Sequence, residues 1–93
     1  MNVHINPVSN TRYSGKNRIA LEVFMKKRNF SVPKWITFYQ AKQLGRKIKK
    51  GEHGIVVFKG YTNIVTNNDK EEIKKESVPL GWAVVFNLDQ TTK

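Results

Sequence analysis

The segment TFYQAKQLG, Thr37 to Gly45, contains the start and stop signals of a helix within nine residues. Thr37 and Gln40 have capping-box spacing, in which the hydroxyl accepts from the Gln40 N–H and the Gln40 side chain reaches back to the Thr37 N–H. Gly45 suits the left-handed position just past a helix. Because Pro33 discourages a helix before this point, Trp35–Ile36 is predicted to be a short extended segment. The middle of the chain is therefore predicted to consist of short extended and helical pieces.

A first helix is predicted to precede this segment. It begins near Asn17, a good N-cap, and stops at Asn29. Basic residues 26–28 fall in its last turn, where cations suit the helix dipole. Its apolar stripe consists of Ile19, Ala20, Leu21, Val23, Phe24 and Met25. Residues 1–16 are rich in turn formers and predict an irregular arm.

Extended segments dominate the second half of the chain. Residues 46–50 are expected to lead into the turn Gly51-Glu52-His53-Gly54, and Ile55 to Val65 to form a long strand. In that strand, Val56 and Phe58 alternate with a mixed set formed by Ile55, Val57, Lys59 and Tyr61. Residues 67–70 predict a turn, and residues 71–78 fit a short helix or a strand, with the strand favoured. The last strand, residues 80–88, carries Trp82, Val84, Phe86 and Leu88 on one face.

This order of elements predicts an α+β fold, with two N-terminal helices packed on a small antiparallel β-meander sheet. Ninety-three residues fit one small domain, here 1–93, with the arm at 1–16 and the core at 17–91. A chain of this length buries only about 60–65% of its unfolded surface, which leaves little room for a deep enzymatic cleft.

Positive charge is concentrated in one part of the chain. The formal net charge is +10, but residues 12–59 contain 13 basic and 2 acidic residues, and residues 60–93 contain 4 basic and 5 acidic residues. A polyanion is the expected partner, with nucleic acid first and an anionic membrane surface second. The absence of cysteine fits a reducing compartment. The polar N-terminal stretch lacks signal-peptide character, and no apolar run approaches the ~20 residues of a membrane span, so we expect a cytoplasmic protein.

Catalytic and metal-binding signatures are missing from the sequence. The two histidines, His4 and His53, are far apart and do not form an HExxH pair. KKGEHG does not match a phosphate-binding P-loop, and there is no serine nucleophile elbow. We therefore expect no enzymatic activity, no bound metal and no cofactor.

The remaining feature is a basic surface interleaved with aromatic residues, which is typical of proteins that bind single-stranded nucleic acid. Tyr13 and Tyr39 are the better candidates for exposed rings, whereas core packing is the competing interpretation for Trp35 and Phe38. Tyr39 and Lys42 share a side of the second helix. The candidate nucleic-acid contacts are Arg12, Tyr13, Lys16, Asn17, Arg18, Lys34, Trp35, Tyr39, Lys42, Arg46, Lys47, Lys49, Lys50 and Lys59.

Four motifs in a fixed order carry a family resemblance. NPVSNTRYSGKN, WITFYQAKQLG, IKKGEHGIVVF and VVFNLDQT together resemble the N-terminal domain of ArdC-type antirestriction proteins, which also occurs in TraC-type plasmid primases. The resemblance implies a domain that binds single-stranded DNA and is carried by plasmids, phages and related mobile elements. It also implies a partner domain, metallopeptidase-like or primase, downstream of this one. The chain is compatible with a piece of a longer protein and with a stand-alone relative.

Two positions depart from the family pattern. Asn10 stands where the family has glycine in its NPxTG turn, and asparagine tolerates the left-handed conformation that such a turn requires. His53 stands where lysine is common, which lowers the charge at the turn.

Three other functions remain open. The domain could bind duplex DNA or RNA, although about eight residues including Pro33 separate the helices and no helix-turn-helix is recognisable. It could be a protein-interaction module that blocks a restriction enzyme, but DNA mimics of that kind are acidic and this chain is basic. An enzyme would require a downstream domain.

Overall fold

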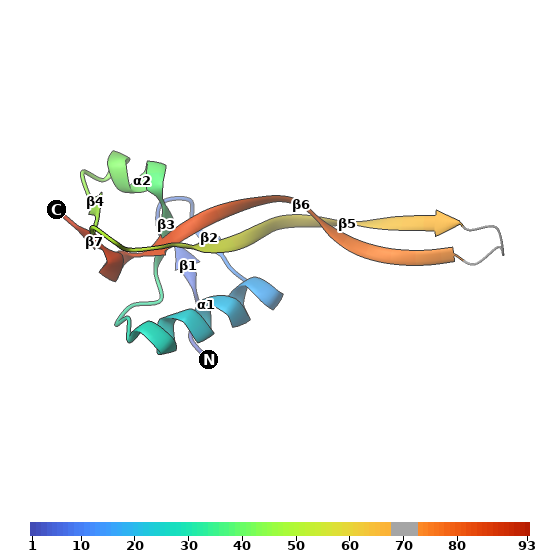
Figure 1. The fold of residues 1–93 in the computed structure, drawn as a ribbon, viewed down its shortest axis with the longest axis horizontal. Coiled ribbons are helices and arrows are strands. Elements are labelled where there is room, and N and C mark those ends of the chain that lie inside the picture. Colours follow the sequence, from blue (N-terminus) through green and yellow to red (C-terminus); the bar gives the residue numbers. More distant parts are fainter. Residues whose placement is uncertain (68–72) are drawn as a thin grey trace.

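The computed structural model describes the backbone of residues 1–67 and 73–93, and the side chains of residues 1–59 and 80–93. The fold is α+β, with two α-helices and several short strands gathered at the base of one long β-hairpin (Figure 1). The helices are α1 (Gly15–Arg28) and α2 (Phe38–Gln43), followed late in the chain by the 3-10 turn η1 (Leu88–Gln90). The strands are β1 (Ile5–Asn6), β2 (Thr11–Arg12), β3 (Trp35–Thr37), β4 (Lys47–Ile48), β5 (Ile55–Asn67), β6 (Ile73–Asn87) and β7 (Thr91–Thr92).

The strands form three antiparallel sheets, not the single meander expected from the sequence. β1 pairs with β2, β4 pairs with β7, and the central sheet has the order β3-β6-β5. β3 precedes β5 in the chain but pairs with β6, in the register Ile36↔Phe86. The meander expectation was wrong because pairing between strands distant in sequence depends on tertiary contacts, which local alternation does not reveal.

Helix α1 begins earlier than predicted. Its N-cap is Ser14, not Asn17, and it ends at Asn29, whose left-handed φ of 57° confirms the predicted stop. Residues 1–16, expected to be an irregular arm, contain β1 and β2 and the start of this helix. The β1–β2 hairpin turn places Asn10 at φ 58°, so asparagine does adopt the left-handed conformation at the position where the family has glycine.

Helix α2 has the predicted ends. The Thr37 hydroxyl accepts from the Gln40 N–H at 3.1 Å, and the Gln40 side chain accepts from the Thr37 N–H at 3.0 Å. Gly45 follows the helix at φ 69°. Local sequence determined this element because both of its signals are contained within it.

The β5–β6 hairpin extends away from the rest of the chain, which makes the molecule 58 Å long and 26 Å wide (Figure 1). Strand β6 begins at Ile73, which confirms the strand that was favoured over a short helix for this part of residues 71–78. The predicted turn at residues 67–70 falls largely on residues 68–72, which lie outside the described part of the chain.

The main core cluster lies on one face of the central sheet, and Ile36 of β3 and Ala41 of α2 are buried outside this cluster. Leu21, Trp35, Val57 and Val85 are each at most 2% exposed and form one cluster. Helix α1 and the segment after it cover this face through Phe24 and Phe30, which pack around Trp35. The core is therefore built on the mixed set of β5, the set that contains Val57.

The opposite face of the hairpin is apolar and open. Phe58 and Trp82 are cross-strand partners, as are Val56 and Val84. Their exposed fractions are 41% and 67% for the aromatic pair and 42% and 37% for the valines. The predicted alternation is confirmed, but the purely apolar set faces away from the core.

The turn Gly51–Gly54 uses its two glycines for different reasons. Gly51 has φ 83°, which favours glycine. At Gly54, a Cβ atom would lie 2.6 Å from both the Val84 Cγ1 atom and the Val85 carbonyl oxygen. Gly54 therefore permits close approach of this segment to β6.

Candidate nucleic-acid interface

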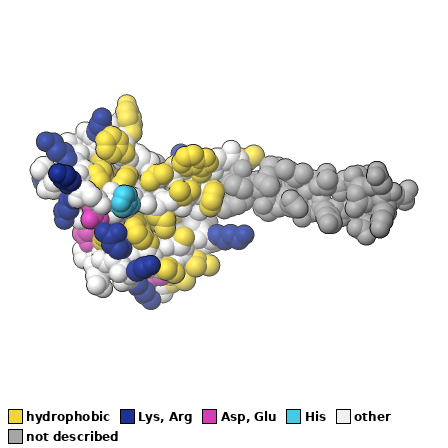
Figure 2. Space-filling model, viewed as in Figure 1, with side chains coloured by type: hydrophobic (Ala, Val, Ile, Leu, Met, Phe, Trp, Pro, Cys, Tyr) yellow, Lys and Arg dark blue, Asp and Glu magenta, His cyan; other side chains and the backbone are white. Residues whose placement is uncertain are grey.

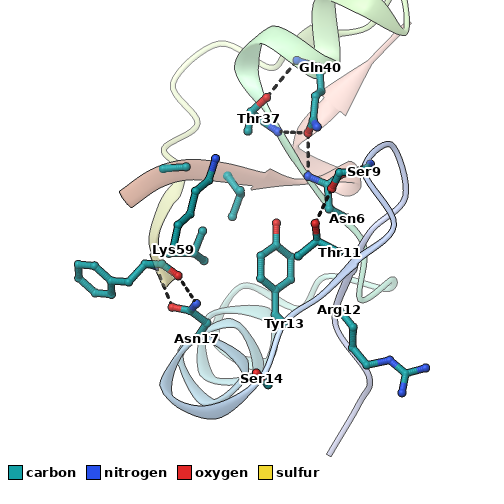
Figure 3. Close-up of a pocket in the computed structure, with 14 residues that line it drawn as sticks. Asn6, Ser9, Thr11, Arg12, Tyr13, Ser14, Asn17, Thr37, Gln40 and Lys59 are labelled. Carbon is teal, nitrogen blue, oxygen red and sulfur yellow. Dashed lines mark hydrogen bonds between the residues drawn. The ribbon is translucent and has the colours of Figure 1, made fainter. Parts of the chain in front are cut away.

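A groove of about 610 Å³ lies between the β1–β2 hairpin, the start of α1, Gln40 of α2 and the inner face of the central sheet (Figure 3). We call it the central groove. Its lining residues are Asn6, Ser9, Thr11, Arg12, Tyr13, Ser14, Asn17, Thr37, Gln40, Val57, Phe58, Lys59, Ala83 and Val85. Four of the sequence-predicted candidates meet here: Arg12, Tyr13, Asn17 and Lys59.

A hydrogen-bonded amide chain forms the upper wall of the groove. The Asn6 Nδ2 group donates to Gln40 Oε1 at 2.7 Å, and the same oxygen accepts the Thr37 N–H. Asn6 Oδ1 accepts the backbone N–H groups of Val8 and Ser9 at 3.0 and 3.2 Å. These bonds orient both amides and join the N-terminal hairpin to helix α2.

Tyr13 points its hydroxyl into the groove (Figure 3). Its ring packs against the core cluster, and burial raises the pKa of its phenol, with a side-chain hydrogen bond to Asn6 acting in the opposite direction. The phenol is therefore neutral around pH 7 and retains its proton as a donor.

Asn17 forms the lower rim and has a structural role. Its Nδ2 donates to the Phe58 carbonyl at 2.7 Å, and its Oδ1 accepts the Phe58 N–H at 2.9 Å. Since β5 is an edge strand, these two bonds satisfy backbone groups that have no partner strand. The predicted N-cap residue of α1 thus joins the helix to the sheet.

The basic candidates are distributed over more than one region. Lys59 extends along the central groove, whereas the Arg12 guanidinium extends away from it (Figure 3). Lys42, Arg46 and Lys47 line a smaller depression of about 180 Å³ beside Phe38. Figure 2 shows Lys and Arg side chains gathered at the end of the molecule that carries α2 and β4, with others over α1. Among the candidate contacts, the exposed lysines that line neither hollow are Lys16, Lys34, Lys49 and Lys50.

Besides Asn17, three further candidates are engaged by the protein itself. Arg18 donates to the carbonyl oxygens of Met1 and Asn2, and Arg46 donates to Thr91 Oγ1 at 2.7 Å. Trp35 is 0% exposed, so its expected contact with nucleic acid was wrong and the competing core interpretation holds. Its large ring packs against Phe24 of α1 and Phe30, which makes it part of the core cluster.

Trp35 belongs to a buried polar chain that also contains His4. The Trp35 Nε1–H group donates to His4 Nδ1 at 2.9 Å, which leaves the His4 Nε2–H group to donate to Glu22 Oε1 at 2.9 Å. Both imidazole nitrogens are therefore occupied. In the described part of the chain, no three His, Asp or Glu side chains lie close enough together to hold a metal ion.

Sequence reasoning missed the polar groove residues Asn6, Ser9, Thr11 and Gln40, and the exposed ring of Trp82. Asn6 and Gln40 both stand in the family motifs, so their spacing contained a signal that was interpreted only as turn and cap chemistry. For Trp82, the sequence signal was that only two helices are predicted, so no third helix is available to cover the face of the sheet that carries this ring. Tyr39, which was predicted to be exposed, is 69% exposed.

The chain is a small α+β domain with a strongly basic sequence and one central groove among its described residues. Residues 1–86 match the family described as the N-terminal domain of anti-restriction factor ArdC, and the chain belongs to this family. The resemblance predicted from the four motifs is confirmed. Among the helices of the described residues, none has the length and apolarity to cross a membrane.

Solved structures agree with this assignment. The chain is similar to the metal-free crystal structure of the antirestriction protein ArdC from plasmid R388, with 28% identity and a TM-score of 0.72 over 97% of this chain and 32% of that chain. The Mn(II)-bound structure of ArdC from R388 matches with 24% identity and a TM-score of 0.66, over 99% and 31% of the two chains, which supports the fold. The chain spans about a third of the length of these proteins. No curated protein matches the chain.

Proposed function

We propose that this domain binds single-stranded DNA with little sequence specificity and contributes to antirestriction or to the protection of transferred DNA of a mobile element. The observation that carries the proposal is the central groove, which combines the Tyr13 hydroxyl and the Lys59 ammonium with an apolar floor. Membership in the ArdC N-terminal family supports the antirestriction role.

Charge supports a polyanionic ligand. Residues 12–59 have a net charge of +11, and Lys47, Lys49 and Lys50 are exposed around β4. Phosphate contacts carry little sequence information, so affinity that comes mainly from these lysines would be nearly independent of sequence. The exposed ring of Tyr39 lies on the adjacent helix, where a base could stack.

Fluorescence anisotropy with single-stranded and duplex oligonucleotides at two salt concentrations tests the proposal. We expect tighter binding to the single strand and a log–log salt slope of about −0.7 per phosphate neutralised. Affinity that does not change between low and moderate salt would rule out the phosphate mechanism, and equal affinity for duplex would rule out the single-strand preference.

A protein-interaction module that blocks a restriction enzyme is the second candidate. The open apolar face of Val56, Phe58, Trp82 and Val84 favours it, because contiguous exposed apolar residues often mark protein contacts. Duplex DNA and RNA binding have less support, because α2, the helix that precedes Lys47, Lys49 and Lys50 in the chain, has only six residues. A Trp82→Ser protein that binds single-stranded DNA normally but no longer inhibits restriction would favour the second candidate.

We further propose that the domain is a non-enzymatic binding module that acts in the cytoplasm. It would work beside a metallopeptidase-like or primase domain, which fits the observation that the chain spans about a third of its solved relatives. A purified 1–93 domain that binds DNA without cleaving DNA or protein is the expected result.

A further inference from the structure

The central groove offers hydrogen-bond donors, while its amide oxygens are already occupied. Gln40 Oε1 accepts two hydrogen bonds and Asn6 Oδ1 accepts two. Asn17 Oδ1 is bound to the backbone of β5. Among the described residues, no acceptor is bound to Gln40 Nε2 or to the Tyr13 hydroxyl proton. A ligand that fits this groove therefore needs acceptor atoms.

The floor of the groove is apolar. Val57, Ala83 and Val85 come from the inner face of β5 and β6, where they lie beside the ring of Tyr13. A volume of about 610 Å³ lies in the range of small-molecule sites. A flat ligand suits this groove if one of its apolar faces lies on the apolar floor and the acceptor atoms on its edge face the Gln40 amide and the Tyr13 hydroxyl.

Lys59 adds a cation at the side of the same groove. It lies on the same face of β5 as Val57 because the two residues are two positions apart in a strand. Figure 3 shows its side chain running along the side of the groove that lies across from Tyr13. A phosphate attached to the flat ligand would find its counter-charge there.

We propose that the central groove is a subsite for one unpaired nucleobase, with its keto oxygens toward Tyr13 and Gln40 and its adjoining phosphate on Lys59. The inference rests on the proposed function, since it assigns a role to one nucleotide of the bound strand. Thymine fits best: it presents two carbonyl acceptors, whereas cytosine presents an amino donor on the same edge.

This subsite explains why a single strand would be selected. In a duplex the thymine O4 is paired with adenine and the base is stacked, so the base must first be unstacked and unpaired, at a cost that a single strand avoids. Only one base is inserted, and the remaining affinity comes mainly from phosphates. The resulting preference for thymine is therefore modest and compatible with little overall sequence specificity.

Anisotropy titrations of the 1–93 protein with three oligonucleotides of equal length, oligo-dT, oligo-dC and an abasic strand, test the subsite. We expect wild-type protein to bind oligo-dT at least about fivefold more tightly than the abasic strand, with oligo-dC between them. Tyr13→Phe removes only the hydroxyl and should weaken oligo-dT binding about 2- to 10-fold while leaving abasic binding unchanged. Ser31→Ala, which removes an exposed hydroxyl outside the groove, is the control and should change neither.

A wild-type measurement makes the test independent of any variant. In a nitrogen-15 NMR titration, the Gln40 side-chain amide signals should shift with thymidine 5′-monophosphate and stay in place with deoxyribose 5-phosphate. Equal affinity for oligo-dT and the abasic strand, or unmoved Gln40 signals, would overturn the base subsite while the proposed single-strand binding stands. Failure to bind any of the three strands would overturn both.

Discussion

At the scale of single residues, several motif positions have structural roles that their residue types explain. Asn87 and Gln90 of the VVFNLDQT motif form a second capping box, and Gln90 Nε2 also donates to the His53 carbonyl at 2.7 Å. Glu52 accepts from Arg28 at 2.8 Å. The Gly51–Gly54 turn is thereby joined both to α1 and to the C-terminal turn.

Gly51→Val should destabilise the domain. A β-branched residue at φ 83° costs about 1–3 kcal/mol, which in a domain of this size lowers the melting temperature by about 4–8 °C per kcal/mol. Thermal unfolding followed by circular dichroism provides the measurement. Unchanged stability combined with lost DNA binding would instead make the turn a direct DNA contact.

Glu22 should make stability depend on acidic pH. The His4 hydrogen bond, followed by the Asn2 backbone N–H, holds the pKa of this carboxyl at about 2, below its ordinary value of 4.5. Because the folded pKa is depressed, the stabilisation is complete above about pH 4.5 and is lost as the pH falls toward 2. Urea unfolding at several pH values should show a steeper acid loss for wild type than for Glu22→Gln. Parallel pH profiles for the two proteins would contradict this.

At the scale of elements, the connection from α2 into β4 concentrates charge on a short, well-anchored piece of backbone. Arg46 N–H bonds to the Ala41 carbonyl, and Lys49 N–H bonds to the Gln90 carbonyl at 2.8 Å. These bonds fix the backbone from which the exposed side chains of Lys47, Lys49 and Lys50 extend. A localised contact with a DNA backbone requires such an anchored segment.

Two lysine triples distinguish a localised contact from diffuse attraction. Changing Lys47, Lys49 and Lys50 to Glu should weaken single-stranded DNA binding by about tenfold or more. The matched change at Lys70, Lys74 and Lys75, whose side chains lie outside the described part, should cost less because Glu71, Glu72 and Glu76 are adjacent in sequence. Anisotropy at one ionic strength compares them. Equal losses would leave only diffuse attraction.

At the scale of the whole molecule, the β5–β6 hairpin has a core on one side and an open apolar face on the other. The two tryptophans report on this asymmetry, since Trp35 is 0% exposed and Trp82 is 67% exposed.

Trp35→Phe should lower the free energy of unfolding by about 2–4 kcal/mol, through lost packing and an unpaired His4 Nδ1. Trp82→Phe should change stability by less than about 0.5 kcal/mol. Urea unfolding of both variants measures these values, and similar losses would contradict a one-sided core.

The sequence by itself determined the elements whose signals are local. The capping box at Thr37 and Gln40, the left-handed stops at Asn29 and Gly45, and the alternation of β5 and β6 each depend on residues within a few positions of one another. Tyr39 was predicted to be exposed for the same reason. The family motifs were likewise readable in order, because each is a short contiguous stretch.

Only the tertiary structure decided which strands pair and which face of the hairpin is covered. β3 joins β6 across about fifty residues, and Asn17 reaches the β5 edge across 41 residues. The central groove exists because Asn6, Tyr13, Gln40 and Lys59, spread over more than half the chain, converge when the N-terminal hairpin docks on the sheet. Burial of Trp35 and exposure of Trp82 follow from the same docking. Local periodicity does not contain that information, because both rings lie in strands and only long-range packing determines which one enters the core.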